Sequence, residues 1–270
     1  KNKHKLGAWL GKLVYKKLKS RTKIARKNLT ACFPEKSTEE IEQMVEDCLV
    51  QLSTGFIEGT HAWWRDMSEH KENVVVTGLE NVMKAQQKGK GVLILGGHFA
   101  VVDFAIPLFA SKVENLAYMY RPNNNPVIDH MIEKGRARSG VDSFTKKQLK
   151  EMKAFMGNGG MVWYGCDQDF GKKADVFAPF FGVQAANITT PSWIVQETGA
   201  AVIFMGMRRL NDGRYEIEFS EELPPFGSDD QRDAVNWNQK LEEAVARYPT
   251  QYMWVHKRFK TRPEGEASFY

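Results

Sequence analysis

The chain has 270 residues and a formal net charge of +5, and hydrophobic residues make up 42% of it. This apolar content excludes a disordered chain and is enough for a full core. The positive charge is confined to the start: residues 1–34 hold eleven Lys and Arg and no acid, whereas the other 236 residues hold 27 basic and 33 acidic groups. Because the basic charge is not spread over the fold, the composition argues against a nucleic-acid-binding domain.

The first predicted element is a helix over residues 6–18. Apolar residues recur there at helical spacing with lysines between them, namely Leu6, Trp9, Leu10, Leu13, Val14 and Leu18. Such a basic amphipathic helix either packs on its own domain or contacts an anionic membrane surface, and a nucleic-acid arm is a third interpretation. We assign residues 1–36 to a basic amphipathic, membrane-proximal helical segment and residues 37–270 to a single α/β domain.

The elements that follow alternate between helix and strand. Ser37 and Glu40 form a capping box that begins a helix reaching about Trp64. Strands are predicted over 74–77, 91–95, 116–120, 161–165, 201–207 and 215–219, and helices over 79–88, 101–111, 126–138, 148–156, 191–197 and 230–247. This order predicts an α/β fold with a central, mainly parallel sheet covered by helices, preceded by an N-terminal helical segment.

The strongest local signal follows the strand over 91–95, where Gly96 and Gly97 precede His98 and Asp103. Ligands of open α/β sheets bind beyond the carboxyl ends of the strands, and glycines allow a sharp turn there. On a regular helix, residues five apart point about 140° away from each other. Contact therefore requires His98 to lie before the helix and Asp103 in its first turn. Asp103 would then accept a hydrogen bond from Nδ1 and leave Nε2 as a base; the alternative is a capping His and a merely stabilising Asp.

No G-x-S-x-G is found, and no Walker loop or G-x-G-x-x-G follows a strand, so a serine nucleophile and a nucleotide cofactor are not expected. A His–Asp pair alone suits direct transfer, in which the His deprotonates a hydroxyl that attacks an activated acyl group. The developing oxyanion needs a donor. Arg121, Arg136 and Arg138 are the candidates, with solvated side chains as the alternative.

The strand over 161–165 also ends in polar residues, because Asp167 and Asp169 follow it closely. One of these acids would orient or tune the His and the other would cap the next turn, or both would serve plain turn chemistry. Cys166 has no dedicated base in the sequence, so we predict a packed, reduced thiol.

Aromatic residues and cations mark two further stretches. Residues 176–182 are predicted to form a stiff aromatic loop that either lines an apolar channel or seals the core, and the candidate channel residues are Trp163, Phe177, Phe180 and Phe181. Residues 256–263 place Arg258, Lys260 and Arg262 where phosphate groups at a channel mouth would be bound, with a solvated tail as the alternative. No His, Cys or acid spacing typical of a metal site is present, so we predict neither a metal nor a cofactor.

Together these stretches resemble the late acyltransferases of lipid A biosynthesis, the lauroyl and myristoyl transferases of Gram-negative bacteria. The matching stretches are 28–34, the His98/Asp103 block, 120–122 with 125–126 and Arg136, 167–171, 180–182, 251–252 with Trp254, and 256–263. The His-x4-Asp block alone is shared with glycerolipid acyltransferases. The 167–171 and C-terminal blocks make the assignment firmer.

The resemblance implies roles for individual residues. His98 is the general base, Asp103 its partner, Arg136 the oxyanion-stabilising arginine, and Asp169 or Asp167 supports the His from the second strand. The family often has Glu where this chain has Asp103. The substrate-binding set comprises Arg121, Asn125, Trp163, Phe180, Phe181, Arg258, Lys260 and Arg262.

The resemblance also implies the reaction and its location. A fatty acyl chain of the laurate or myristate class moves from acyl carrier protein to a hydroxyl of a 3-hydroxyacyl chain on a lipid A precursor, without a covalent enzyme intermediate. The expected partners are acyl carrier protein, an anionic glycolipid and the membrane surface, with no nucleic acid. The expected site is the cytoplasmic face of the bacterial inner membrane, although the hydrophobic anchor usual in the family is not found in these 270 residues.

Three alternatives stay open at this point. The first is a glycerophospholipid or other glycolipid acyltransferase with the same His-x4-Asp site. The second is a catalytically weak lipid-binding protein, and the third is a hydrolase that uses water as the acceptor. Neither the acyl-chain length nor the acceptor hydroxyl follows from the residues.

Overall fold

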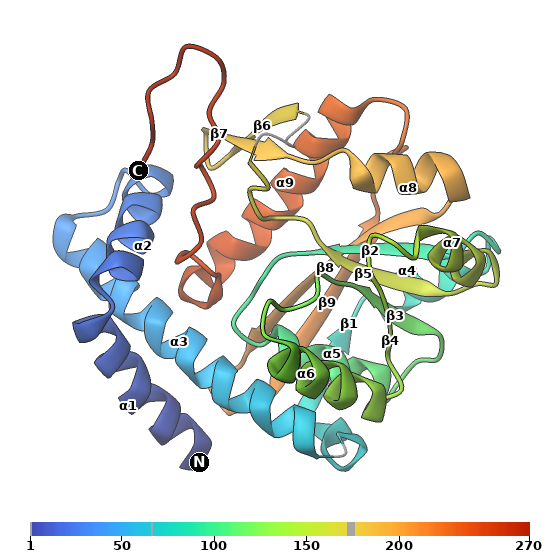
Figure 1. Cartoon of the computed structure of the whole chain (residues 1–270), viewed down its shortest axis with the longest axis horizontal. Helices are drawn as coiled ribbons and strands as arrows, with labels where there is room; N and C mark the ends of the chain where they lie inside the picture. The colour runs from blue at the N-terminus through green and yellow to red at the C-terminus, as the bar shows by residue number, and fades with distance from the viewer. Residues whose placement is uncertain (1, 66, 172–175) are drawn as a thin grey trace.

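The centre of the molecule is a seven-stranded sheet, seen in a computed structural model that describes residues 2–65, 67–171 and 176–270 (Figure 1). Its strand order is β1 (Val74–Thr77), β9 (Tyr215–Glu222), β8 (Ala201–Arg209), β2 (Val92–Gly96), β5 (Met161–Gly165), β3 (Leu116–Met119) and β4 (Asp142–Phe144). Neighbouring strands pair in parallel except β8 and β9, which are antiparallel. The central strand β2 is buried along its whole length, as parallel strands covered on both faces are.

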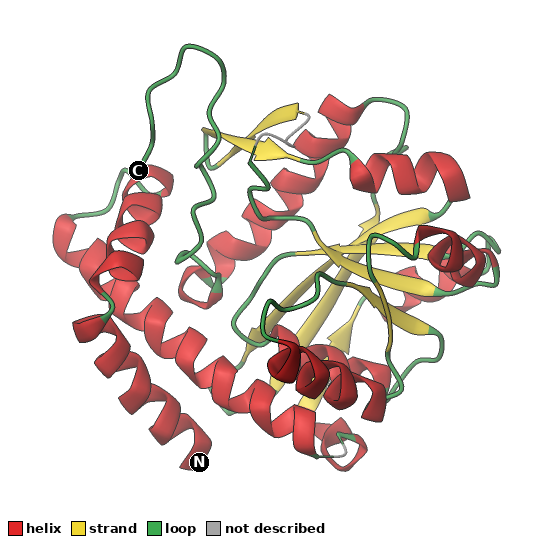
Figure 2. Cartoon of the chain, viewed as in Figure 1, coloured by secondary structure: helices red, strands yellow, loops and turns green. Residues whose placement is uncertain are grey.

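Helices cover both faces of this sheet (Figure 2). Figure 1 shows α5 (Val102–Ala110) and α6 (Pro126–Arg138) on one side, and α8 (Thr190–Thr198) and α9 (Asp230–Arg247) on the other. The remaining helices after residue 70 are α4 (Leu79–Gln86) and α7 (Leu149–Gly157), and the 3₁₀ turns are η1 (Ser68–Asn73) and η2 (Pro249–Gln251). The predicted α/β class with a mainly parallel sheet is confirmed.

Three helices form the N-terminal part of the chain: α1 (Asn2–Lys17), α2 (Lys19–Cys32) and α3 (Thr38–Trp64). The predicted capping box is present, because Ser37 Oγ accepts from the Glu40 N–H and the Glu40 carboxylate accepts from the Ser37 N–H. α1 runs along α3 (Figure 1), and Gly7 and Gly11 face the backbone of Thr54 and Val50, where a Cβ would clash. The glycines therefore set the close approach of the two helices.

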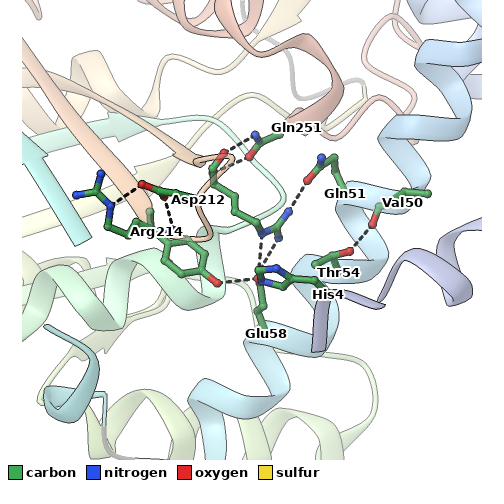
Figure 3. Close-up of polar contacts among 10 residues, drawn as sticks. His4, Val50, Gln51, Thr54, Glu58, Asp212, Arg214 and Gln251 are labelled. Carbon is green, nitrogen blue, oxygen red and sulfur yellow. Dashed lines mark hydrogen bonds and ion pairs between the residues drawn. The ribbon is translucent and has the colours of Figure 1, made fainter. Parts of the chain in front are cut away.

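A buried ion-pair network ties α1 and α3 to the sheet (Figure 3). Glu58 on α3 is fully buried, and it accepts hydrogen bonds from the guanidinium of Arg209 on β8 and from the hydroxyl of Tyr215 on β9, the latter over 2.6 Å. His4 on α1 lies 2.9 Å from the same carboxylate. Because burial makes an unpaired charge costly, these contacts fix how the N-terminal helices sit on the sheet.

Several elements differ from the sequence prediction, including α2 and β7, for which no separate helix or strand was predicted. The region 176–182, predicted as an aromatic loop, forms strand β6 (Val176–Phe180) of an antiparallel hairpin with β7 (Val183–Asn187), outside the main sheet. Phe181 takes a left-handed backbone conformation at the turn, with φ of 50°. Pro179 and the lack of strict alternation hide this strand in the sequence. The short strand β4 was not predicted either, because three residues carry too little periodic signal.

Within the described ranges, no helix combines the length and apolar content needed to cross a bilayer.

Candidate active site

Two neighbouring strands of the sheet bring His98 and Asp167 together. The parallel register pairs Gly96 of β2 with Gly165 of β5, and each functional residue lies two positions beyond its glycine. The His98 N–H donates to Asp167 Oδ2 over 2.9 Å, and His98 Nδ1 contacts Asp167 Oδ1. The site thus forms at the carboxyl ends of parallel strands, where the fold class places ligands.

Gly165 makes room for the His98 imidazole. A Cβ on Gly165 would lie 2.9 Å from His98 Cε1 and 2.8 Å from Trp163 Cη2. Trp163 is buried, and its ring packs edge-on against the imidazole with centroids 6.2 Å apart. A side chain at position 165 would displace the imidazole from the Trp163 ring. Glycine is therefore needed here because there is no space for a Cβ, and not because of the backbone torsion angles.

The contacts of His98 define its tautomer. An ionised carboxylate only accepts hydrogen bonds, so Nδ1 carries the proton that faces Asp167 and Nε2 keeps its lone pair. The His98 side chain is 28% exposed, whereas that of Asp167 is 2% exposed. Nε2 is therefore available as a base at the surface of the site.

The pair shifts the pKa values of both groups. Burial disfavours the imidazolium, but the charge and hydrogen bonds of Asp167 outweigh it, and the net pKa of His98 is raised. Burial alone would raise the pKa of Asp167, but His98 and its backbone N–H, with a further hydrogen bond from Tyr252, hold that pKa far below its usual range. Asp167 therefore stays ionised.

Asp103 was expected to contact His98, and the structure corrects this expectation. His98 does lie before α5 and Asp103 does lie in its first turn. The Asp103 carboxylate instead accepts a hydrogen bond of 3.1 Å from Arg136 on α6. The expected contact used local spacing alone, whereas the parallel register supplies Asp167, from 69 residues away, to the same imidazole nitrogen.

Arg136 is held in place on three sides. Besides Asp103, its guanidinium stacks on the ring of Tyr118 at 4.5 Å and faces that of Tyr120 at 5.8 Å. Its Nε has no hydrogen-bond partner within the described part of the chain. The charges of Asp103 and Arg136 both act on His98, in opposite directions. Arg136 is thus a fixed cation whose charge acts on His98, and its unpartnered Nε–H is buried.

Asp169, the other acid beyond β5, serves the turn and the C-terminal segment. Its carboxylate accepts hydrogen bonds from the N–H of Gly171 over 2.7 Å and from the N–H and hydroxyl of Thr261 over 2.6 and 2.8 Å. Of the two acids left open by the sequence, Asp167 is the one in contact with His98. Cys166 is a buried free thiol whose pKa is raised well above its usual value by burial, which confirms the predicted packed thiol.

Besides the buried Trp163, two further residues expected at a substrate channel lie in the interior. Arg258 is 2% exposed; its guanidinium donates to the carbonyl oxygen of Ala186 over 2.7 Å and to Asn187 Oδ1 over 3.1 Å. Phe180 is fully buried and packs on Trp254, with centroids 6.1 Å apart. The β6–β7 hairpin accounts for both positions, because it folds over these side chains instead of lying open as a loop.

The other expected substrate residues lie nearer the surface. Arg121 and Asn125 are exposed, and Asn125 Oδ1 caps α6 by accepting from the N–H of Val127 over 3.0 Å. Lys260 is exposed, whereas Arg262 is partly buried, pairs with Glu266 and donates to the Gln184 carbonyl oxygen over 2.6 Å.

Tyr118 on β3 was not identified from the sequence as a neighbour of the site that contains His98 and Asp167. Tyr118 stands opposite Trp163 in the β3–β5 register, and its buried hydroxyl has no partner among the described residues. Only the strand order, which puts β5 between β2 and β3, makes Tyr118 part of the site.

The fold and this His–Asp–Arg arrangement are compatible with an acyl-transfer type of site, and known sequences identify the family. The family described as "Bacterial lipid A biosynthesis acyltransferase" matches residues 2–261. The chain is 36% identical to the lipid A biosynthesis lauroyltransferase of Escherichia coli (strain K12), over 99% of this chain and 88% of that protein. It is 34% identical to the palmitoleoyltransferase of the same strain, over 98% and 87%, and 27% identical to its myristoyltransferase, over 98% and 82%.

The chain therefore belongs to the bacterial lipid A biosynthesis acyltransferase family and is an acyltransferase. This membership bears out the resemblance drawn from the sequence and favours a lipid A enzyme over the glycerolipid, lipid-binding and hydrolase alternatives.

Proposed function

We propose that the protein transfers a fatty acyl chain from acyl carrier protein to a hydroxyl of a 3-hydroxyacyl chain on a lipid A precursor, with His98 as the general base. The observation that carries this proposal is the contact of Asp167 with His98 Nδ1, which leaves Nε2 free at a strand-end site. The names of the relatives, which are lauroyl-, palmitoleoyl- and myristoyltransferases of lipid A biosynthesis, support the acyl group and the acceptor class.

The proposed step needs no covalent enzyme intermediate. His98 Nε2 takes the proton of the acceptor hydroxyl while the oxygen attacks the thioester carbonyl. The tetrahedral species collapses, the C–S bond breaks, and the proton on His98 passes to the leaving thiolate. The products are the ester and the free thiol of the carrier, and His98 returns to its starting form. Asp167 orients the imidazole and stabilises its transient positive charge.

Arg136 is proposed to stabilise the oxyanion. Its charge acts on His98, so the cation lies within electrostatic range of the proposed base. Asp103 holds this guanidinium by its hydrogen bond, and the ring of Tyr118 supports it from one face. A donor fixed before the reaction stabilises charge that develops in the transition state without a cost of reorganisation.

The anionic acceptor and the membrane are proposed to meet the basic N-terminal segment. On α1 the face away from α3 exposes Leu6, Trp9 and Leu13, with Trp9 63% exposed. Lys5, Lys12 and Lys16 are exposed beside them. An apolar stripe flanked by lysines fits an anionic lipid surface, which we place at the cytoplasmic face of the inner membrane. Lys260, which is also exposed, is proposed as a contact for a phosphate of the acceptor.

Mass spectrometry of the acceptor tests the function. The purified chain is incubated with a lipid A precursor and acyl carrier proteins that bear chains of several lengths, and a mass increment names the acyl group transferred. We expect His98→Ala to lower kcat by at least about 10²-fold. His130→Ala, which changes an exposed histidine on α6, is the matched control and should retain the wild-type rate. Hydrolysis of the thioester without transfer to the lipid would overturn the proposal.

A further inference from the structure

The C-terminal segment 251–261 holds the turn that carries His98. It lies between α2 and α9 (Figure 1). The Met253 N–H donates to the His98 carbonyl oxygen over 3.1 Å, and the Ala100 N–H donates to the Gln251 carbonyl oxygen over 2.7 Å. The backbone at His98 and just after it is therefore paired with this segment.

The same C-terminal segment also holds the loop that presents Asp167. The Asp169 carboxylate accepts hydrogen bonds from the N–H and the hydroxyl of Thr261 over 2.6 and 2.8 Å. The Asp169 N–H donates to Nε2 of His256 over 3.1 Å. The loop is thus fixed two residues after the carboxylate that contacts His98 Nδ1, so one segment holds both members of this pair.

The contact with the Asp169 N–H defines the state of His256. A backbone N–H only donates, so Nε2 of His256 carries a lone pair and the proton of the neutral imidazole lies on Nδ1. Burial lowers the pKa of His256. The charges of Asp167 and Asp169 oppose this effect and those of Arg258 and His98 add to it, and the net pKa is lowered. His256 is therefore a neutral acceptor at neutral pH.

The backbone of His256 is itself held from α2. Asn28 is fully buried, and its Nδ2 donates to the carbonyl oxygens of Trp254 and His256 over 2.7 and 2.8 Å. Its Oδ1 accepts a hydrogen bond from the hydroxyl of Tyr270. A buried amide that is bonded at both ends has one orientation, so the imidazole of His256 meets the Asp169 N–H from a fixed backbone.

We propose that His256 is a positioning residue for acyl transfer: its neutral Nε2 holds the Asp169 N–H and so keeps the Asp167 carboxylate aligned with Nδ1 of His98. This inference rests on the proposed function for its catalytic meaning. His256 acts through the loop after β5 and exchanges no proton with the substrate. Without the acceptor the Asp169 N–H loses its partner, and misplacement of the group that orients the base by about 1 Å lowers a rate by up to about 10²-fold.

Two substitutions of His256 separate the acceptor from the volume of the side chain. His256→Leu removes the acceptor, whereas His256→Gln supplies Oε1 near the place of Nε2. Lys257→Leu is the matched control, because it introduces the same side chain at the next position, which is exposed. For His256→Leu we expect kcat to fall about tenfold with KM for both substrates changed less than about twofold. His256→Gln should recover kcat to within about threefold of the wild type, and Lys257→Leu should match the wild type.

Hydrogen exchange tests the contact without any activity. The protection factor of the Asp169 amide, measured by NMR, should fall at least about tenfold in His256→Leu and be kept in His256→Gln and Lys257→Leu. The downfield proton of His98 Nδ1, identified by its absence in His98→Gln, should broaden and move upfield in His256→Leu alone.

The wild type gives a test that needs no variant. Protonation of His256 turns Nε2 into a donor, which cannot accept the Asp169 N–H. The protection factor of this amide should therefore fall as pH is lowered through the NMR midpoint of His256, which we expect below 6.5, and not through that of His98, which we expect above 6.5. In His256→Gln this step should be absent.

Equal protection of the Asp169 amide in His256→Leu and the wild type would overturn the inference, and so would a kcat in His256→Gln as low as that in His256→Leu. If His256→Leu did not fold, the wild type would decide, because a protection factor that ignores the His256 midpoint contradicts the contact. If the wild type transferred no acyl group, the proposed function would fall, and the exchange data with the His98 proton would still decide whether His256 holds the loop.

Discussion

Asp103 of α5 and Arg136 of α6 form an ion pair with an N–O distance of 3.1 Å, next to but separate from the pair of His98 and Asp167. The two carboxylates of the site thus have different partners. Asp103 holds the Arg136 cation, whereas Asp167 holds the imidazole of His98. In the His-x4-Asp motif, His98 lies in the turn before α5 and Asp103 lies in the first turn of α5, so the motif contributes one residue to each pair. The His and the Asp of the motif need not be hydrogen-bonded to each other.

Asparagine at each acid should separate these roles. Asp167→Asn lets the amide donate to Nδ1, which turns the tautomer and places the proton on Nε2, so we expect kcat to fall at least about 10²-fold. Asp103→Asn keeps the base intact and weakens only the hold on Arg136, so its kcat should stay clearly above that of Asp167→Asn. Steady-state kinetics with a saturating acyl donor measure both.

The pH profile provides the internal control for this pair of variants. Asp167→Asn should also lower the pH of the acidic limb, because Asp167 is the main group that raises the pKa of His98, whereas Asp103 contributes less. Equal losses of kcat in the two variants would contradict the division of roles.

The His98–Asp167 pair should stabilise the fold most strongly at mildly acidic pH. The raised pKa of His98 gives stability that is fully present below its ordinary value of 6.5 and is lost as pH rises through the folded value. The lowered pKa of Asp167 gives stability that is present above its ordinary value of 3.8 and is lost as pH falls through the folded value. The Tm difference between wild type and His98→Gln should thus be largest between pH 3.8 and 6.5. A difference that grows above pH 8 would contradict this sign.

Strand-end signals in the sequence singled out His98 and left Asp167 and Asp169 as alternatives, and Arg136 was chosen among three arginines only by the family resemblance. The sequence could not assign the partner of His98. Residues 98 and 103 are neighbours in the chain, but the partner of Nδ1 is decided by the β2–β5 register, which only the assembled sheet defines.

The same limit explains the C-terminal block. A run of cations around aromatics resembles a phosphate site at the level of composition. Burial of Arg258 depends on the β6–β7 hairpin and α9, which supply its acceptors from residues 72 and 20 positions away. Charge content alone does not reveal which cations face water.

Arg258 should therefore act on stability and not on acceptor binding. Arg258→Met leaves the buried carbonyl of Ala186 and the amide oxygens of Asn187 and Asn238 without this donor, so the free energy of unfolding should fall by about 2–4 kcal/mol. KM for the lipid acceptor should stay at its wild-type value. Urea unfolding and steady-state kinetics on the same preparations give the two quantities.

Lys260→Met, two positions further along and exposed, is the control and should unfold within about 0.5 kcal/mol of the wild type. A raised acceptor KM with unchanged stability in Arg258→Met would show that Arg258 reaches the substrate after all.

The Glu58 network should be a large contributor to stability. Arg209→Met removes the guanidinium from the fully buried Glu58 carboxylate, which keeps its contacts with Tyr215 and His4, and breaking a buried pair on one side costs about 3–5 kcal/mol. Urea unfolding measures this loss. Lys88→Met, which breaks the exposed pair with Glu222, is the control and should cost less than about 1 kcal/mol. Similar losses in the two variants would contradict the special position of Glu58.

The outer face of α1 should bind anionic membranes. Gly7 and Gly11 use the opposite face for packing on α3, so Trp9 and Leu13 are free to enter a lipid surface without disturbing the fold. Trp9→Glu with Leu13→Glu should lower the fraction that sediments with vesicles of anionic phospholipid several-fold, because acids replace apolar contacts beside the lysines.

Met83→Glu changes an equally exposed apolar residue on α4 and should sediment like the wild type. Higher salt should weaken wild-type binding, since exposed charges are screened. Sedimentation that is equal in all three proteins would rule out α1 as the membrane contact.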